Sequence, residues 1–381
     1  MISYETQPEQ AILVHIEFGK QANNKLSELR ELALSAGAKI IGECVTHRET
    51  PDPKFSLGAG KVEELKQQIL ATQPDLIIFN HDLTPSQERN LEKEFNLRVL
   101  DRTGLILDIF ARRAKTFEGK LQVELAQVQY LASRLRRAWT HLERQRGGRI
   151  GMTGPGETQL ELDKRLLQTR VKYLKKRLSK VKNTRALSRQ SRQKSALPTV
   201  SLVGYTNAGK STLFNQLTGE AIYAANQLFA TLDPTLRRCR LSETHSVILA
   251  DTVGFIRNLP HGLIQAFSAT LEETVLADVL LHVIDASDLD KAILIEAVHE
   301  VLQELGVLDK PMIQVMNKID LIAPTDLLTT DTIIAPEPNF TPRIDRDAEG
   351  RAVRVWISAH KKLGLDLLAE ALSEYLPPKL G

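Results

Sequence analysis

The first 110 residues alternate short apolar runs with amphipathic segments. The apolar runs predict β-strands over residues 11–18, 39–46, 75–80 and 97–101. Between these runs, apolar residues recur every three or four positions, which predicts helices over residues 24–37, 60–73 and 86–95. Because strands alternate with helices, we expect a small parallel α/β domain over residues 1–110.

The next stretch carries apolar residues at helical spacing on both sides of a loop rich in glycine and proline, residues 147–156. The first stripe consists of Leu121, Leu125, Val128, Leu131, Leu135, Ala138 and Leu142. The second stripe consists of Leu162, Leu166, Val171, Leu174, Leu178 and Val181. Two such helices predict an antiparallel hairpin that is held shut along its apolar seam and turns its charge outward. We expect this hairpin and a polar linker to span residues 111–195.

Charge is distributed very unevenly along the chain. From Arg112 to Lys194 there are 23 Lys and Arg against 6 Asp and Glu, a net charge of +17, whereas the whole chain carries +3. Positive charge gathered in this way is typical of an arm that binds a polyanion. The alternative is a solvated helical surface without a partner.

The stretch from residue 196 to residue 381 contains "GYTNAGKS" at Gly204 to Ser211, between a β-branched run and an amphipathic segment. In this G-x-x-x-x-G-K-[ST] pattern, backbone N–H groups wrap phosphates, the catalytic Lys210 binds the β- and γ-phosphates, and the Ser211 hydroxyl coordinates Mg²⁺. The nucleotide-binding residues predicted here are Gly204, Tyr205, Thr206, Asn207, Ala208, Gly209, Lys210, Ser211 and Thr212. The third domain is therefore predicted to be a P-loop domain.

Three further motifs each end a predicted strand, and together they favour GTP over ATP. In "DTVG", Asp251 can hold Mg²⁺ through water and the Gly254 N–H can meet the γ-phosphate. In "NKID", the Asp320 carboxylate can accept hydrogen bonds from N1–H and the 2-amino group of guanine, a donor pair that adenine lacks. In "SAH", a backbone N–H can meet the guanine O6. The binding residues predicted from these motifs are Asp251, Thr252, Val253, Gly254, Asn317, Lys318, Ile319, Asp320, Ser358, Ala359 and His360.

The first switch of a GTPase belongs in "LFATLDPTLRR", where a threonine closes over Mg²⁺ and the γ-phosphate. The residues expected to contact nucleotide there are Phe229, Ala230, Thr231, Leu232 and Asp233, and both Thr231 and Thr235 are candidates for the metal-binding threonine. Phe255 follows "DTVG" at the position where many GTPases carry a glutamine that orients the attacking water. We therefore expect hydrolysis to be slow, or the water to be oriented by another group or by a partner.

These motifs resemble those of the HflX family of GTPases, and "GPGETQLELDKR" before the P-loop domain and "DRTGLILDIFARRA" at Asp101 to Ala114 strengthen the resemblance. The resemblance implies Thr231 as the threonine that coordinates Mg²⁺. It also implies a factor that binds ribosomes and splits their subunits under stress, with the N-terminal region entering the ribosome. On this view Arg146 and Arg149 flank the hairpin tip and meet phosphates of large-subunit ribosomal RNA, while GTP and GDP are substrate and product.

The remaining features bear on location and on rival functions. The chain has no apolar run of the roughly 20 residues that a membrane helix needs, no secretory signal and two distant cysteines, Cys44 and Cys239, so we expect a cytoplasmic protein. We also expect it to be monomeric and to have no DNA partner. One rival is an RNA-remodelling ATPase with an additional nucleotide site at "GAGK"; the valine after Lys61 argues against it. The other is a signalling GTPase with a protein target only, against which the +17 segment argues.

Overall fold

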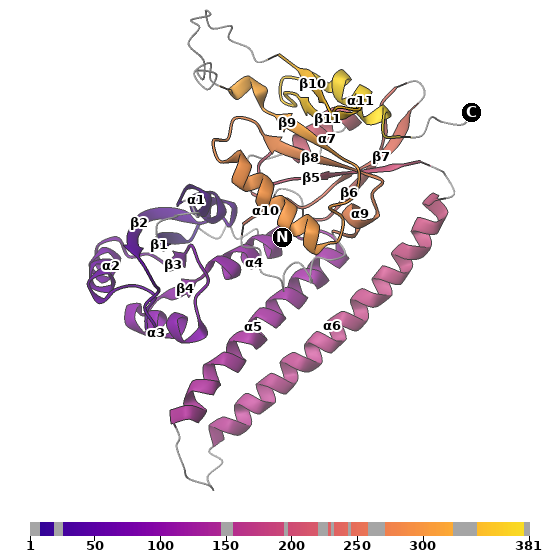
Figure 1. Ribbon diagram of the computed structural model, residues 1–381. Coiled ribbons are helices and arrows are strands. Elements are labelled where there is room, and N and C mark those ends of the chain that lie inside the picture. The colour runs from indigo at the N-terminus through magenta and orange to yellow at the C-terminus, as the bar shows by residue number, and fades with distance from the viewer. Residues whose placement is uncertain are drawn as a thin grey trace, which may run out of the picture. The chain divides into compact units, whose positions relative to one another are not determined.

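A computed structural model describes residues 8–18, 26–145, 155–193, 197–219, 228–229, 232–242, 245–257, 271–322 and 341–376. Figure 1 shows two α/β parts and a pair of long helices. The chain divides into two compact units, the first ending at Lys180 and the second beginning at Val181. The predicted boundaries of three domains remain predictions, and each unit is described separately below.

The first unit opens with a four-stranded parallel sheet in the order β2-β1-β3-β4. The strands are β1 (Gln10–Phe18), β2 (Lys39–Arg48), β3 (Leu76–Phe79) and β4 (Arg98–Leu100). The helices are α1 (Leu26–Ser35), α2 (Ala59–Thr72), α3 (Pro85–Phe95) and α4 (Arg102–Arg113). The predicted parallel α/β architecture is confirmed, because the hydrophobic periods of two and 3.6 residues mark these elements locally.

Local sequence explains where these elements begin and which of them are buried. β1 is buried from Ala11 to Ile16 because it is an inner strand covered on both faces. Thr84 caps the N-terminus of α3: its hydroxyl accepts a hydrogen bond from Gln87 N, while the Gln87 side chain accepts one from Thr84 N. Pro85 follows at the first helical position, where its missing N–H costs nothing.

The predicted helical hairpin consists of α5 (Phe117–Gln145) and α6 (Pro155–Gln193). Its seam is closed by Leu121 and Leu125 of α5 and by Leu174 and Leu178 of α6, with Val128 and Val171 packed beside them. Further along the two helices the prediction of a closed seam is wrong. Leu131, Leu162 and Leu166 are 51%, 50% and 60% exposed. Ala138 and Leu142 lie where the structure does not describe side chains.

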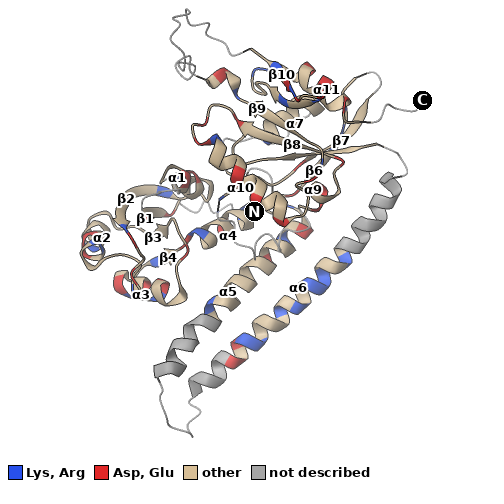
Figure 2. Cartoon of the chain, viewed as in Figure 1, with Lys and Arg blue, Asp and Glu red and all other residues tan. Residues whose placement is uncertain are grey.

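The two long helices are cationic. Figure 2 shows Lys and Arg spread along the described part of α6; between Asp163 and Val181, α6 holds eight Lys and Arg and no Asp or Glu. Within the described part of the chain, no helix combines the length and the apolarity that crossing a membrane requires.

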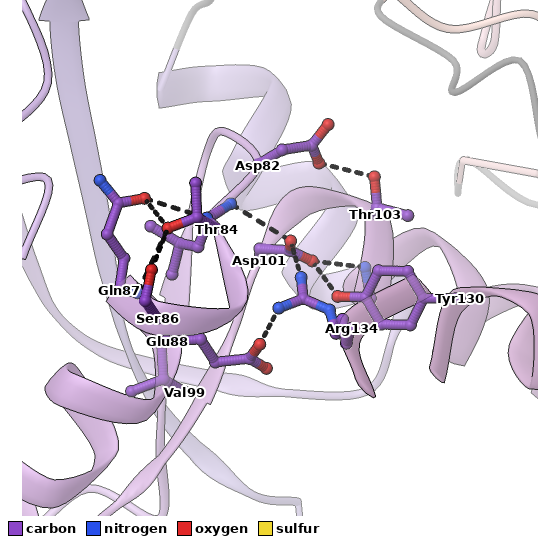
Figure 3. Close-up of polar contacts among 12 residues, drawn as sticks. Asp82, Thr84, Ser86, Gln87, Glu88, Val99, Asp101, Thr103, Tyr130 and Arg134 are labelled. Atoms are coloured by element: carbon purple, nitrogen blue, oxygen red, sulfur yellow. Dashed lines mark hydrogen bonds and ion pairs between the residues drawn. The ribbon is translucent and has the colours of Figure 1, made fainter. Parts of the chain in front are cut away.

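One buried carboxylate joins the hairpin to the N-terminal sheet (Figure 3). Asp101, at the end of β4, is 1% exposed and caps α4 by accepting a hydrogen bond of 2.8 Å from Gly104 N. The Tyr130 hydroxyl of α5 donates to the same carboxylate at 2.6 Å, and the Arg134 guanidinium pairs with it. Arg134 also pairs with Glu88 of α3. Asp101 therefore holds α4 and α5 at the carboxyl end of the sheet.

The second unit is built on a seven-stranded sheet in the order β10-β11-β9-β8-β5-β7-β6. The strands are β5 (Thr199–Val203), β6 (Thr235–Arg240), β7 (Ser246–Asp251), β8 (Val279–Asp285), β9 (Met312–Asn317), β10 (Arg343–Arg346) and β11 (Ala352–Trp356). The helices are α7 (Lys210–Thr218), α9 (Glu272–Leu276), α10 (Lys291–Glu304) and α11 (Leu365–Ser373), with a 3₁₀ turn at Ile319–Leu321.

The five inner strands of this sheet are parallel, and the edge strands β6 and β10 are antiparallel to their neighbours. Leu213 of α7 and Leu368 of α11 pack on one face with Val200 and Leu202 of β5. Ser201 lies between these two β5 residues and faces the other side, where its hydroxyl is 3.3 Å from that of Thr274 in α9. The carboxyl ends of the parallel strands meet at one edge, which is where ligands bind in such sheets.

Candidate guanine-nucleotide site

The loop between β5 and α7 requires glycine at two positions. Gly204 has φ +149°, and a Cβ there would lie 2.2 Å from the carbonyl oxygen of Val283. Gly209 has φ +96°, and a Cβ there would lie 2.3 Å from Asn317 Nδ2. The loop therefore fits closely against β8 and β9.

Lys210, the first residue of α7, is buried at the centre of this loop, with 6% of its surface exposed. Its Nζ donates to the carbonyl oxygens of Gly204 at 3.0 Å and Tyr205 at 2.8 Å. Burial lowers the pKa of Lys210 to about 8, against the opposing attraction of Asp251. Among the described contacts, no carboxylate is hydrogen-bonded to this ammonium. An anionic ligand could therefore pair with it.

Ser211 and Asp251 come together from α7 and from the end of β7. The Ser211 hydroxyl donates to Asp251 Oδ2 at 2.8 Å, and Asp251 is fully buried. Hydroxyl and carboxylate oxygens are the ligands that Mg²⁺ prefers, so this pair fits the predicted metal.

The two motifs expected to recognise guanine, "NKID" and "SAH", meet each other and the loop between β5 and α7. Asn317 donates from Nδ2 to Ala208 O at 2.9 Å and accepts at Oδ1 from Ala359 N at 2.9 Å. It therefore links the loop between β5 and α7, the phosphate loop, to the loop after β11, which contains the buried Ser358. Asp320 Oδ1 is buried and has no hydrogen-bond partner among the described residues. A buried carboxylate oxygen without a donor is expensive, and guanine N1–H and the 2-amino group are suitable donors.

The residues after β7 pack against the phosphate loop. Thr206 N donates to Phe255 O at 2.8 Å, and Phe255 N donates to Gly204 O at 3.1 Å. The Phe255 side chain is 1% exposed, so it belongs to the core. Thr252 is also anchored, because its hydroxyl donates to Leu202 O at 2.6 Å.

The first switch is described only in part. Leu228, Phe229 and Leu232 are each 2% exposed. Ala230 and Thr231 lie outside the described residues, and so do Arg146 and Arg149 at the hairpin tip. Thr235 begins β6, where it pairs with Asp251, so its backbone belongs to the sheet.

One acidic residue at the carboxyl edge of this sheet was not predicted from the sequence. Asp285 ends β8, and its Oδ2 atom forms an ion pair of 2.7 Å with Lys318 Nζ. The backbone of Lys318 has a positive φ of +65°. A signal was present, since an acidic residue closes the apolar run "VLLHVI" between two recognised motifs. The assignment of individual residues to nucleotide contacts remains a prediction.

Comparison with known proteins agrees with this geometry. Family models described as GTP-binding GTPase N-terminal, GTP-binding GTPase Middle Region and 50S ribosome-binding GTPase match residues 23–111, 113–192 and 199–318. The chain is 53% identical over 369 residues to GTPase HflX of Escherichia coli, covering 97% of this chain and 83% of that protein. It is 46% identical over 368 residues to GTPase HflX of Caldanaerobacter subterraneus, covering 97% and 81%.

Among solved structures, the crystal structure of SsGBP in complex with GDP matches 97% of this chain and 98% of that chain. The TM-score is 0.52 and the sequence identity is 26%. The sequence relatives, the family models and this fold together show that the chain is a P-loop GTPase.

Proposed function

The chain belongs to the HflX family of GTPases, and from this premise we propose that it binds the large ribosomal subunit in its GTP form and leaves as the GDP form. The observation that carries the proposal is the joining of two features in one chain. A domain matched by the 50S ribosome-binding GTPase model follows directly after a hairpin segment of net charge +17. Ribosomal RNA is the polyanion that suits such an arm.

In this proposal the nucleotide binds across the carboxyl edge of the second sheet. Lys210 exchanges its contacts with the Gly204 and Tyr205 carbonyls for the β- and γ-phosphates. Asp320 accepts from guanine, and Gly254 offers its N–H to the γ-phosphate. Ser211 and Thr231 would hold Mg²⁺, with Asp251 behind them; the ion supplies neutralising charge on the phosphates.

The hairpin carries the contacts to RNA. Arg146 and Arg149 flank the glycine-rich tip and would meet phosphates of large-subunit ribosomal RNA, where glycines allow close backbone approach. Binding there promotes separation of the subunits, and the protein acts as a monomer in the cytoplasm. A DNA partner is not part of the proposal.

Co-sedimentation tests this function. The purified chain is spun with 70S ribosomes, 50S subunits or 30S subunits in the presence of GDP or a non-hydrolysable GTP analogue. We expect retention on 50S and 70S particles with the analogue and release with GDP, and light scattering should report subunit separation. Lys210→Ala should abolish the difference between nucleotides. Equal binding to all particles in both nucleotides would contradict the proposal.

A further inference from the structure

Two aromatic side chains of the hairpin lie at the surface. Phe117, the first residue of α5, is 55% exposed, and Tyr173 of α6 is 46% exposed. In the part of the chain whose side chains are described, the other aromatic residues are buried or half-buried. Rings left in water add little to folding, and neighbouring exposed apolar groups commonly mark an interaction surface.

One arginine joins the two rings. The Arg177 guanidinium lies 4.8 Å from the centroid of the Phe117 ring and 5.6 Å from that of the Tyr173 ring, and it donates to the Tyr173 hydroxyl at 3.3 Å. A second guanidinium, that of Arg170, lies 5.3 Å from the Tyr173 centroid and pairs with Glu124 of α5. At such distances a cation is attracted to an aromatic ring. We call this surface, formed by Phe117, Arg170, Tyr173 and Arg177, the aromatic platform.

Positive charge surrounds the aromatic platform. No Asp or Glu lies between Asp163 and Val181, and the exposed lysines of this stretch include Lys172, Lys175, Lys176 and Lys180. A partner that fits this surface must therefore combine negative charge with flat apolar groups. RNA offers one phosphate and one flat base per nucleotide, and its bases are accessible to side chains where they are unpaired.

We propose that the aromatic platform binds an unpaired nucleotide of RNA, with the base stacked on the Tyr173 ring and the neighbouring phosphates on the lysines around it. This inference rests on the proposed function, in which the hairpin binds ribosomal RNA, and it adds a contact beside the closed seam, away from the predicted tip. Arg177 can stay in place, because guanidinium planes also stack on bases. Every base has a flat face, so the aromatic platform recognises an exposed base rather than a sequence.

Two RNA strands separate stacking from charge. The probes are a short fluorescein-labelled oligoadenylate and an abasic strand of the same length, which keeps the phosphates. Tyr173→Leu removes the ring but keeps apolar bulk. We expect it to lower oligoadenylate affinity about 5- to 100-fold, the range for losing one stacked base, and to leave the abasic strand unaffected. Tyr173→Phe and Tyr173→Trp keep a ring and should stay within about threefold of the parent chain.

A matched control and a direct signal accompany these variants. Leu166→Ala removes an apolar side chain that is 60% exposed on the same helix but carries no ring, so it should bind both strands normally. In Tyr173→Trp, a base stacked on the new indole should quench its fluorescence. Oligoadenylate should therefore quench this variant more than it quenches the parent chain, which contains Trp139 and Trp356. Urea unfolding should show equal stability, because the Tyr173 side chain is exposed.

Sedimentation with 50S subunits in the non-hydrolysable GTP analogue relates the aromatic platform to the ribosome. Tyr173→Leu should weaken retention about fivefold or more, and Tyr173→Trp should retain it. A parent chain that does not bind 50S subunits refutes the proposed function, and the comparison of the two strands still decides the aromatic platform.

Three results would overturn the aromatic platform alone. The first is unchanged binding of oligoadenylate and 50S subunits in Tyr173→Leu. The second is an equal loss for oligoadenylate and the abasic strand, which indicates charge or structure rather than stacking. The third is loss of 50S binding with normal oligoadenylate binding, which would assign this surface to a protein partner.

Discussion

In the proposed nucleotide site, two side chains are expected to decide base selectivity and phosphate binding. Asp320 Oδ1 is buried without a partner among the described residues, and Lys210 is buried against two carbonyl oxygens. Asp320 can therefore accept hydrogen bonds from a base, and Lys210 can pair with phosphate oxygens. Base selectivity and the pH dependence of binding should therefore follow from these two residues.

Base selectivity should follow the chemistry of Asp320. In Asp320→Asn the amide can donate a hydrogen bond where the carboxylate only accepts, so xanthine nucleotides become preferred. We expect GTP affinity to fall at least about 100-fold, because each of two hydrogen bonds to a charged group contributes about 1.5–3 kcal/mol. Competition titration with GTP, XTP and ATP measures this. Equal binding of ATP and GTP by the unaltered chain would show the assignment to be wrong.

Nucleotide affinity should weaken in alkali because of Lys210. Burial lowers the pKa of the free ammonium to about 8, and bound phosphates raise it. The bound form thus keeps a proton that the free form loses, so affinity is complete below pH 8 and falls as the pH rises above it. We expect GDP affinity to fall about five- to tenfold between about pH 7.5 and 9, measured by titration. Constant affinity over this window would contradict the burial of an ionisable Lys210.

At the scale of elements, the hairpin is closed near its attached end and is joined there to the N-terminal sheet. Its seam is closed where Leu121 and Leu125 meet Leu174 and Leu178. Its connection to the N-terminal sheet passes through Asp101, which receives Tyr130 and Arg134 from α5 (Figure 3). Stability and RNA binding by this element can therefore be altered separately, one at the attached end and the other at the tip.

Asp101→Asn should destabilise the first unit by about 2–4 kcal/mol, because Arg134 loses its buried counter-charge. Tyr130→Phe removes a single hydrogen bond of 2.6 Å and should cost about 1 kcal/mol. Urea unfolding followed by circular dichroism gives both values. The assignment fails if the asparagine variant is no less stable than the phenylalanine variant.

At the hairpin tip, replacing Arg146 and Arg149 with alanine should weaken ribosome binding without affecting GTP binding. For each arginine that is removed, binding releases about one counterion fewer from the RNA. The slope of the logarithm of the binding constant against the logarithm of the salt concentration should therefore shrink by about 1.5–2 for the pair. Ribosome affinity across a salt series measures this. The seam residues are untouched, so the helices should remain folded; normal binding at every salt concentration would mean that the tip only connects two helices.

At the scale of the whole molecule, a GTPase and a cationic arm share one chain. α6 contains the boundary at Lys180 and Val181, where the first unit ends and the second begins. In the proposed function the ribosome acts on both units, and the GTPase site responds to what the arm binds.

We expect GTP turnover to be slow in the free chain and about tenfold or more faster with 50S subunits, because Phe255 cannot orient water. Steady-state phosphate release with and without subunits measures this. Lys210→Ala and Ser211→Ala should impair turnover in both conditions. A fast basal rate that ribosomal subunits leave unchanged would refute the expectation.

The sequence by itself determined the elements and the family. Strands such as β1 and helices such as α3 follow from local periodicity and capping, and the phosphate loop follows from spacing that a strand–loop–helix turn imposes over eight residues. The HflX resemblance is confirmed by relatives that cover most of the chain. These features depend on neighbours in the sequence, so the residues alone specify them.

Only the tertiary structure decided which of these residues are buried and which meet. Periodicity shows which leucines share a helix face, but the partner decides how far that face is covered; Leu131, Leu162 and Leu166 are exposed for this reason. Asp101 meets α5, and Asn317 joins the Ala208 and Ala359 backbones, across separations of 29 to 109 residues. Such contacts depend on chain folding in three dimensions, which spacing along one strand or helix does not encode.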